Sequence, residues 1–276
     1  MAHNCQLAEG LWTMRAESVN FDEKIRRCLR IVQDFFGSNL SGLRVLDLGA
    51  GEGGLSLELA AQGAQVVCVE GREMNIAKAK FAASALGLNI EFRCQDVRDL
   101  DESERYDAVL CFGLLYHLDL KSSVQVIQKI GTVTERLLVL DTHFSVTAPE
   151  AIDLDGKTYR GHHVQEHTEG TTVQEKAARA WASLDNEASF WLSKPSLLNE
   201  LGRAGFNTVY EAAFPLVYDY WNRQTEERMK YRDRSTFVAA RSVATPLLTA
   251  TAVNTVKTRE VPEDLEKQLV NWPSPG

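Results

Sequence analysis

Residues 45–60, VLDLGAGEGGLSLELA, join a short apolar run to a glycine-rich loop and then to a stretch with helical spacing. This order is typical of the first strand, turn and helix of a doubly wound α/β sheet, in which ligands bind at the carboxyl ends of the strands. Gly49, Gly51 and Gly54 fit the pattern GxGxxG. Residues without a side chain let the backbone approach a ligand closely. The segment therefore predicts a ligand-binding loop after the first strand.

Apolar runs and helical segments alternate on both sides of this loop, from about residue 43 to residue 140, which indicates βαβ units and a parallel sheet. The expected strands are 44–48, 66–70, 90–93, 108–112 and 137–141, and the helices between them are 53–62, 73–86 and 122–131. An amphipathic helix ending at Gly37 is expected before the first strand, and another helix starts at Pro195. Two last strands are expected at 207–214 and 235–241.

A long insertion interrupts this alternation after the fifth strand. Residues 142–194 exceed a normal connection and carry four of the six histidines, and long excursions of this kind usually serve a site. The last 31 residues hold four of the seven prolines. We therefore expect one α/β domain at 1–242, with 142–194 as a substrate lid, and a C-terminal tail at 243–276.

Composition and charge narrow the class of protein. Hydrophobic residues make up 44% of the 276 positions, so a folded core is available, and the net charge of -8 argues against a nucleic-acid partner. No apolar run approaches the roughly 18 residues of a membrane span, and the start of the chain lacks the pattern of a secretory signal. We expect a cytoplasmic protein without a membrane partner; these features do not set its oligomeric state.

Charge also separates two ligands that a glycine loop can hold. Asp47 lies two residues before Gly49, where the pyrophosphate of a dinucleotide would meet it with a repulsion on the order of 4 kcal/mol at about 4 Å and an effective dielectric of about 20. S-adenosylmethionine brings an ammonium and a sulfonium instead, and its adenosine hydroxyls suit carboxylates at Glu70 and Asp96. The charge pattern therefore favours this methyl donor, with S-adenosylhomocysteine as its product, over a dinucleotide.

The chain resembles the class I S-adenosylmethionine-dependent methyltransferases, strongly over residues 43–141 and in general layout to about residue 241. VLDLGAGEGG is similar to the glycine loop of that family, VVCVEG to its acidic second strand, CQDVRDL to its third motif and YDAVLCFGLLYHL to its fourth. The resemblance implies a doubly wound, Rossmann-like α/β fold with a seven-stranded, mostly parallel sheet. Its one antiparallel strand would belong to the final hairpin at 207–214 and 235–241.

The resemblance also implies which residues hold the cofactor. They are Asp47, Gly49 and Gly51 at the methionyl end, Glu70 at the ribose, Asp96 and Val97 at the adenine edge, Met74 over the adenine face, and Phe112 and Gly113 under the methionine moiety, with Ala50 and Gly71 beside them. Arg15, in the polar leader, is a candidate to pair with the cofactor's carboxylate. We predict no metal among the ligands.

Methyl transfer mainly requires alignment, exclusion of water and, for a hydroxyl or ammonium acceptor, removal of a proton. A base should therefore follow the strands at the cofactor end of the sheet, which selects Tyr116, His117 and His143 as catalytic candidates. Phe190 and Trp191 are candidates for an apolar acceptor pocket. We predict an S-adenosylmethionine-dependent methyltransferase that acts on a small-molecule acceptor, with O- or N-methylation favoured over carbon.

Other interpretations remain open. The run GLLYHL has a weaker resemblance to enzymes that transfer a carboxymethyl group to wobble uridine and to their small-molecule relatives, so an RNA-modifying methyl or carboxymethyl transferase is one alternative. A protein that binds the donor without transferring methyl is another. His163 to His167 formally fits HxxEH, which on a helix would place two histidines near a zinc ion as in one class of metallopeptidase. Asp141 ends the fifth strand, where a metal-assisted methyltransferase would place a ligand.

Overall fold

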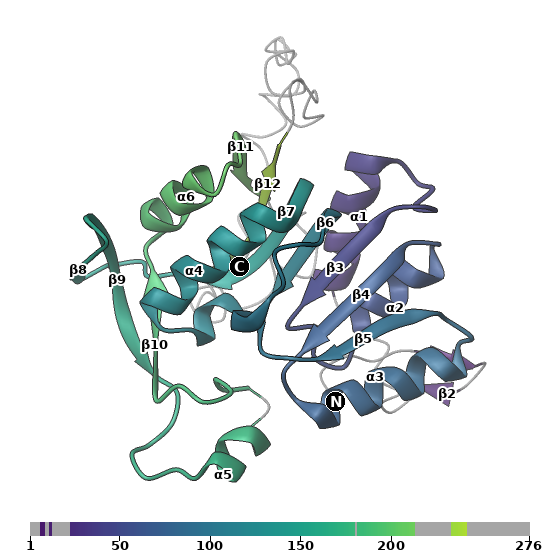
Figure 1. Cartoon of the computed structure of the whole chain (residues 1–276), viewed down its shortest axis with the longest axis horizontal. Coiled ribbons are helices and arrows are strands. Elements are labelled where there is room, and N and C mark those ends of the chain that lie inside the picture. The colour runs from purple at the N-terminus through teal and green to yellow at the C-terminus, as the bar shows by residue number, and fades with distance from the viewer. Residues whose placement is uncertain (1–5, 9–10, 13–22, 180, 213–232, 242–276) are drawn as a thin grey trace, which may run out of the picture. The chain divides into compact units, whose positions relative to one another are not determined.

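The structure is a computed structural model (Figure 1), which describes residues 6–8, 11–12, 23–179, 181–212 and 233–241. Its main sheet has seven strands in the order β11-β12-β7-β6-β3-β4-β5. The strands are β3 (Arg44–Leu48), β4 (Gln65–Glu70), β5 (Ile90–Cys94), β6 (Tyr106–Phe112), β7 (Thr134–His143), β11 (Thr208–Glu211) and β12 (Arg234–Ala240). Only β12 runs against its neighbours in this sheet. The predicted α/β class and the single antiparallel strand are confirmed.

Helices cover both faces of the sheet because consecutive residues of its strands are apolar and point to opposite sides. Val45 and Val66 pack with α1 (Glu23–Phe36) and α2 (Gly54–Ala61), and Cys68 on the same face packs with Ile76 of α3 (Glu73–Ala85). Leu46 and Val67 face α4 (Leu120–Val133) and α6 (Lys194–Arg203). Figure 1 shows the two helical layers with the sheet between them. The doubly wound arrangement leaves the carboxyl ends of β3 to β6 open for a ligand.

The insertion after β7 forms a small sheet of its own. Its strands β8 (Glu150–Leu154), β9 (Lys157–Gln165) and β10 (Ala188–Leu192) pair in the antiparallel order β10-β9-β8, and α5 (Val173–Ala178) lies between β9 and β10 in the chain. His163 therefore lies in an extended strand, and the HxxEH segment does not form the helix on which a zinc pair would depend. The alternative of a helical metallopeptidase site, which the pattern left open, is therefore wrong for this segment.

Two short strands, β1 (Gln6–Ala8) and β2 (Leu11–Trp12), pair near the start of the chain, and two 3₁₀ turns, η1 (Val97–Asp99) and η2 (Leu115–His117), follow β5 and β6. Among the described residues, no helix combines the length and apolarity needed to cross a membrane. Arg15 and the predicted tail at 243–276 fall outside the described ranges. The domain and tail boundaries stay predictions.

Gly131→Ala is expected to destabilise the protein by about 1–3 kcal/mol, because a Cβ atom at residue 131 would lie 2.4 Å from the carbonyl oxygen of Ala204. Helix α4 would have to move away from the end of α6. Gly202→Ala is the matched control, since open space surrounds that position, and it should stabilise α6 by up to about 1 kcal/mol. Urea denaturation of both variants measures the contrast; equal stabilities would contradict the close helix contact.

Candidate active site

A cavity of about 410 Å³ opens at the carboxyl ends of the central parallel strands. Most residues predicted to hold a cofactor line it: Asp47, Gly49, Ala50, Gly51, Glu70, Gly71, Asp96, Val97, Phe112 and Gly113. Tyr116 and His117 line it as well. Met74 does not, because its side chain is 68% exposed on α3. The topology thus brings residues from four strands to one space, as the motif order predicts.

The glycine loop takes a shape that side chains would prevent. Gly49, Gly51 and Gly53 have φ angles of +67°, +57° and +79°, in the left-handed region that favours glycine. A Cβ atom at Gly49 would lie 3.0 Å from the Cβ atom of Leu114. The backbone N–H groups of Gly49 and Ala50 donate to the carbonyl oxygen of Val69 at 2.9 and 3.1 Å. These contacts hold the loop against β4 and leave its inner side facing the cavity.

Asp47 presents an unsatisfied carboxylate oxygen at the bottom of this loop. The residue is 1% exposed, and its Oδ2 accepts a hydrogen bond of 2.7 Å from the Ser56 hydroxyl. Its Oδ1 is buried without a hydrogen-bond partner among the described residues. Burial raises the pKa of Asp47 to about 6, against the opposing effect of Ser56. A buried carboxylate with one open oxygen suits a cationic ligand such as an ammonium.

Glu70 ends β4 and bridges two backbone segments. Its carboxylate accepts hydrogen bonds from the N–H groups of Gly51 at 2.9 Å and Arg72 at 2.8 Å. Each carboxylate oxygen has a second lone pair, so Glu70 is still able to accept hydrogen bonds from a vicinal diol in the cavity. Glu70 therefore fixes the loop and offers acceptors to a ligand with the same group.

Asp96 is held by the arginine that follows it. Its carboxylate accepts hydrogen bonds from the Nε and Nη2 atoms of Arg98 at 3.0 and 2.6 Å. Although burial opposes ionisation, these bonds keep the pKa of Asp96 below its ordinary value. Arg98 Nη2 also lies 2.6 Å from Asp185 of the insertion. Asp96 thus connects the cavity to the chain that covers it.

That covering chain is the segment Trp181–Asp185, which we call the cap segment and whose residues all line the cavity. Arg72 donates hydrogen bonds to the carbonyl oxygens of Ala177, Arg179 and Ala182, at 2.8–3.2 Å. A Cβ atom at Gly71 would lie 2.9 Å from Leu184. The insertion therefore forms one wall of the cavity.

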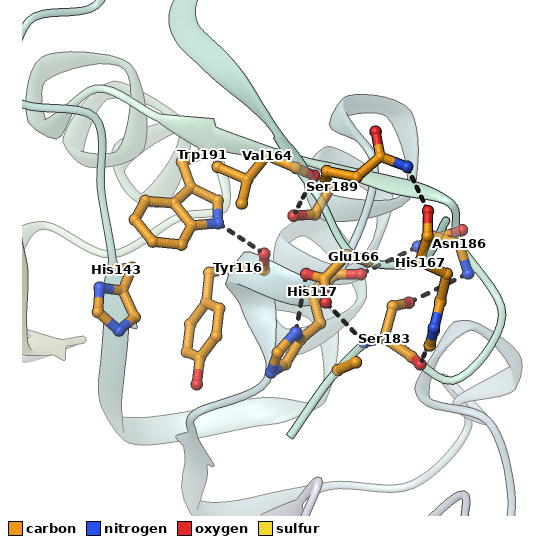
Figure 2. Close-up of polar contacts among 12 residues, drawn as sticks. Tyr116, His117, His143, Val164, Glu166, His167, Ser183, Asn186, Ser189 and Trp191 are labelled. Carbon is orange, nitrogen blue, oxygen red and sulfur yellow. Dashed lines mark hydrogen bonds and ion pairs between the residues drawn. The ribbon is translucent and has the colours of Figure 1, made fainter. Parts of the chain in front are cut away.

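His117 enters the cavity from η2 and is oriented by the insertion. Its Nδ1 lies 2.9 Å from Oε1 of Glu166, as Figure 2 shows. Burial raises the pKa of Glu166, but the hydrogen bonds from His117 and from the backbone of Ser183 outweigh that effect and leave it below its ordinary value. No hydrogen bond to Nε2 of His117 is found within the described ranges. The ring therefore has one nitrogen fixed by a carboxylate and one open nitrogen on a cavity-lining residue.

Tyr116 and His143, the other candidate bases, have different surroundings. Burial raises the pKa of Tyr116 despite the nearby guanidinium of Arg234, so its phenol stays protonated at neutral pH. Burial and then the charge of Arg234 lower the pKa of His143. The His143 ring stacks on Trp191 and meets the edge of Tyr116, at centroid distances of 4.6 and 4.7 Å. His143 thus lies behind Tyr116 and is not among the residues that line the main cavity.

Asp141 is paired with an arginine from the antiparallel strand. Its Oδ1 accepts from Arg234 Nε at 2.7 Å, and its Oδ2 accepts from the Thr236 hydroxyl at 2.9 Å. The carboxylate that a metal-assisted mechanism would use is therefore neutralised by this chain's own guanidinium. Within the described ranges, no group of three or more His, Cys, Asp or Glu side chains is placed to hold a metal ion.

The cavity and wall residues that the sequence analysis did not assign to the site include Arg72, Arg98, Ser183 and Arg234, and it placed Glu166 only in a possible zinc pattern. Two of them had a visible signal, because Arg72 and Arg98 each stand two residues after an acid that the motifs single out, Glu70 and Asp96. Ser183 and Arg234 have partners far away in the chain, so no local pattern marks them, and the pattern that contains Glu166 does not indicate its contact with His117.

Known proteins resemble this chain over parts of its length. Residues 45–136 match a family described as a methyltransferase domain. The ubiquinone biosynthesis O-methyltransferase of Bradyrhizobium diazoefficiens is 44% identical over 79 residues, which cover 29% of this chain and 31% of that protein. The enzyme of the same name from Rickettsia akari is 26% identical over 127 residues, 46% of each chain. The chain spans about a third of the length of the first curated relatives it matches.

Solved structures extend the likeness beyond the sheet. The N-terminal domain of EvdMO1, crystallised with S-adenosylhomocysteine and D-fucose, is 26% identical with a TM-score of 0.63, covering 86% of this chain and 89% of that one. Magnesium protoporphyrin IX methyltransferase from Synechocystis PCC 6803 shares the fold at 20% identity and a TM-score of 0.51, covering 82% and 86%. Motif order, sheet topology and these matches agree: the chain belongs to the class I S-adenosylmethionine-dependent methyltransferase superfamily.

Proposed function

We propose that the protein transfers a methyl group from S-adenosylmethionine to a hydroxyl group of a small organic acceptor. The observation that carries this proposal is the combination, in one cavity, of an open buried carboxylate oxygen at Asp47 and a carboxylate-oriented imidazole at His117. The first suits the donor's ammonium and the second suits removal of a proton. The relatives named as O-methyltransferases, and the neighbour crystallised with a hydroxylated sugar, support the same acceptor class.

The residues of the cavity fit the donor in its parts. Asp47 would hold the ammonium through its open oxygen, Glu70 the ribose hydroxyls, and Asp96 with Val97 the adenine edge. The glycine loop leaves backbone space for the methionyl chain. When bound, S-adenosylmethionine supplies a methyl group on a positively charged sulfur, which departs as the neutral thioether of S-adenosylhomocysteine.

His117 performs the proton chemistry in this proposal. A hydroxyl oxygen becomes a better nucleophile as it loses its proton, and the open Nε2 of His117 would accept that proton. A nitrogen acceptor that is already neutral, such as an aromatic amine, attacks through its own lone pair and needs no base beforehand. The oriented imidazole therefore favours oxygen over nitrogen as the methylated atom. The cap segment lines the same space and would limit the access of water to it.

Several wider expectations rest on this proposal. A small molecule is the proposed partner, because the cavity of about 410 Å³ is bounded on one side by the cap segment. A cytoplasmic location stays a prediction of the sequence. It is supported by four free cysteines in the described part of the chain, Cys28, Cys68, Cys94 and Cys111, since reducing compartments keep thiols unpaired.

Calorimetric titration tests donor binding and its pH dependence together. We expect S-adenosylmethionine to bind at pH 7 with a dissociation constant of tens of micromolar or tighter, and NAD not to bind. The ammonium stays charged below its pKa near 8, whereas Asp47 protonates as the pH falls through about 6. Because only the ionised carboxylate attracts the ammonium, affinity at pH 5 should be about tenfold lower than at pH 7.

Three kinds of result would contradict the proposal. If S-adenosylmethionine does not bind at pH 7, or if NAD binds in its place, S-adenosylmethionine is not the cofactor. Donor binding without release of S-adenosylhomocysteine, across a panel of phenols, D-fucose, metabolite extracts and total RNA, would instead favour a protein that only senses the donor. Release with total RNA alone would favour the RNA-modifying alternative.

A further inference from the structure

Glu166 connects two parts of the site that lie far apart in the chain. It follows β9, and its backbone N–H donates to the carbonyl oxygen of Glu187 at 2.8 Å. Its side chain is 7% exposed. Oε1 lies 2.9 Å from Nδ1 of His117, and Oε2 accepts a hydrogen bond of 2.8 Å from the backbone N–H of Ser183 in the cap segment. Figure 2 shows this carboxylate between the imidazole and Ser183. One carboxylate thus binds the candidate base and the cavity wall.

The charge state of Glu166 decides the state of the imidazole. Hydrogen bonds keep the pKa of this carboxyl below its ordinary value, so it is an ionised group that only accepts hydrogen bonds. Nδ1 of His117 must therefore be the donor and carry the ring proton. In the neutral ring this leaves the lone pair on Nε2, which is the form that can accept a proton from an acceptor hydroxyl.

The cap segment is held on both sides at this point. Ser183 donates its N–H to Glu166, and its carbonyl oxygen lies 2.8 Å from Nε2 of His167. Asn186 donates from Nδ2 to the carbonyl oxygen of His117 at 3.0 Å. The insertion therefore contacts the backbone of η2 as well as its imidazole, and the position of the cap segment and the orientation of the base are set by the same contacts.

We propose that Glu166 is a positioning residue that holds His117 as a base with an open Nε2 while the cap segment covers the cavity. The catalytic consequence rests on the proposed function. The position of the cap segment and the orientation of His117 are then coupled, because one carboxylate binds both. Oε1 of Glu166 contacts His117, and Oε2 accepts from Ser183. The base is complete only where water is excluded, which limits unproductive proton exchange.

The two donors explain why a carboxylate is needed at residue 166. A glutamine has one acceptor oxygen, and its NH₂ group would face a second donor. In Glu166→Gln we expect the amide oxygen to keep the N–H of Ser183, so the NH₂ group faces Nδ1 of His117. That contact survives only if the ring proton moves to Nε2. The chain offers a matched control in Glu150, whose Oε2 lies 2.6 Å from Nδ1 of His163. That pair is on the surface, with side chains 39% and 54% exposed, and it is not part of the cavity lining.

The experiment compares Glu166→Gln with Glu150→Gln in histidine-labelled full-length protein, without acceptor. Nitrogen NMR reports the tautomer of each imidazole, and His117→Gln assigns the signal. We expect the wild-type His117 signal to show the Nδ1–H form and to lose it in Glu166→Gln, while Glu150→Gln changes His163 alone. The dissociation constant for S-adenosylmethionine should stay within about threefold in both variants.

Turnover supplies the second measurement, as release of S-adenosylhomocysteine with the hydroxyl acceptor that the panel identifies. Glu166→Gln should lower kcat by about 10–100-fold with little change in KM, and Glu150→Gln should leave it unchanged. Glu166→Asp, which keeps both oxygens, should recover part of the loss, and Glu166→Gln should add nothing in the His117→Gln background.

An unchanged His117 tautomer in Glu166→Gln, or additive losses in the double variant, would overturn the proposal. Loss of the Nδ1–H form in Glu166→Gln, together with a wild-type protein that releases no S-adenosylhomocysteine with any acceptor, would confirm the positioning role and refute the proposed function. The two failures are therefore distinguishable.

Discussion

Asp47→Asn is expected to weaken S-adenosylmethionine binding by about 100-fold or more at pH 7 and, at the same time, to stabilise the ligand-free protein. The carboxylate has an open oxygen in a fully buried position, where an ion pair with an ammonium gains several kcal/mol at an effective dielectric of about 20. Asparagine has nearly the same shape and keeps an acceptor for Ser56, but it has no charge. Calorimetry and thermal unfolding of the same preparation measure the two effects.

The gain in stability follows from the direction of the pKa shift. Burial raises the pKa of Asp47 from 3.8 to about 6 in the folded protein. The folded state therefore binds the proton more tightly than the unfolded state does, and this contribution to stability is present below the unfolded pKa and lost as the pH rises through about 6. At pH 7 the ionised group costs about 1–3 kcal/mol. Asparagine removes that cost, and the advantage should disappear near pH 4.

Glu200→Gln is the matched control, because this carboxylate is equally buried, at 0% exposure, but fully partnered. It accepts hydrogen bonds from Tyr159 at 2.8 Å, from Arg203 at 2.9 Å and from Gln128. Burial raises its pKa, yet these donors outweigh that effect and keep it below the ordinary value. Glu200→Gln should therefore destabilise the protein at pH 7 and leave donor binding unchanged. Destabilisation by Asp47→Asn as well would show that the open oxygen has a partner in solution.

The strands of the main sheet were predictable because the residue patterns that indicate them are local in the sequence. Strands buried on both faces read as continuous apolar runs, and the first strand has the predicted bounds, Arg44–Leu48. The predicted bounds of a strand were wrong where its end depends on pairing with another strand. Strand β7 was expected to begin at residue 137 but begins at Thr134, because Thr134 pairs with Tyr106 of β6. The loop was predictable for the same reason, as Asp47 and its glycines are close neighbours in the sequence.

For the insertion, the sequence predicted only that residues 142–194 interrupt the alternation of strands and helices, and not how they fold. Residues Lys157–Gln165 alternate between inward and outward positions, with Tyr159 and Gly161 buried, and this period of two indicates a strand. The HxxEH pattern would bind zinc only on a helix, and this segment is a strand. Glu166 is separated from His117 by 49 residues, and Arg72 holds carbonyl groups more than 100 residues later. Such contacts depend on where the insertion folds back, which no local pattern contains.

His117→Gln is expected to lower turnover by about 10²–10⁴-fold while changing the donor dissociation constant by less than about threefold. The glutamine is similar in length and polarity, so η2 and the cavity wall should keep their places. It cannot accept and then release a proton near neutral pH, so the acceptor hydroxyl would have to lose its proton to water in a covered cavity. Release of S-adenosylhomocysteine under saturating donor measures the loss.

Tyr116→Phe and His143→Asn separate this assignment from the other two candidates. Tyr116 lines the cavity but keeps its proton, because burial raises its pKa. His143 lies behind it, against Trp191. Both variants should therefore lose less than about tenfold in turnover, through packing alone. If turnover of either variant falls as far as that of His117→Gln, the base is the residue changed in that variant. His117 would then only help to hold the cavity wall in place. If only His117→Gln falls, the acceptor's proton leaves through His117, a cavity-lining imidazole that a buried carboxylate orients.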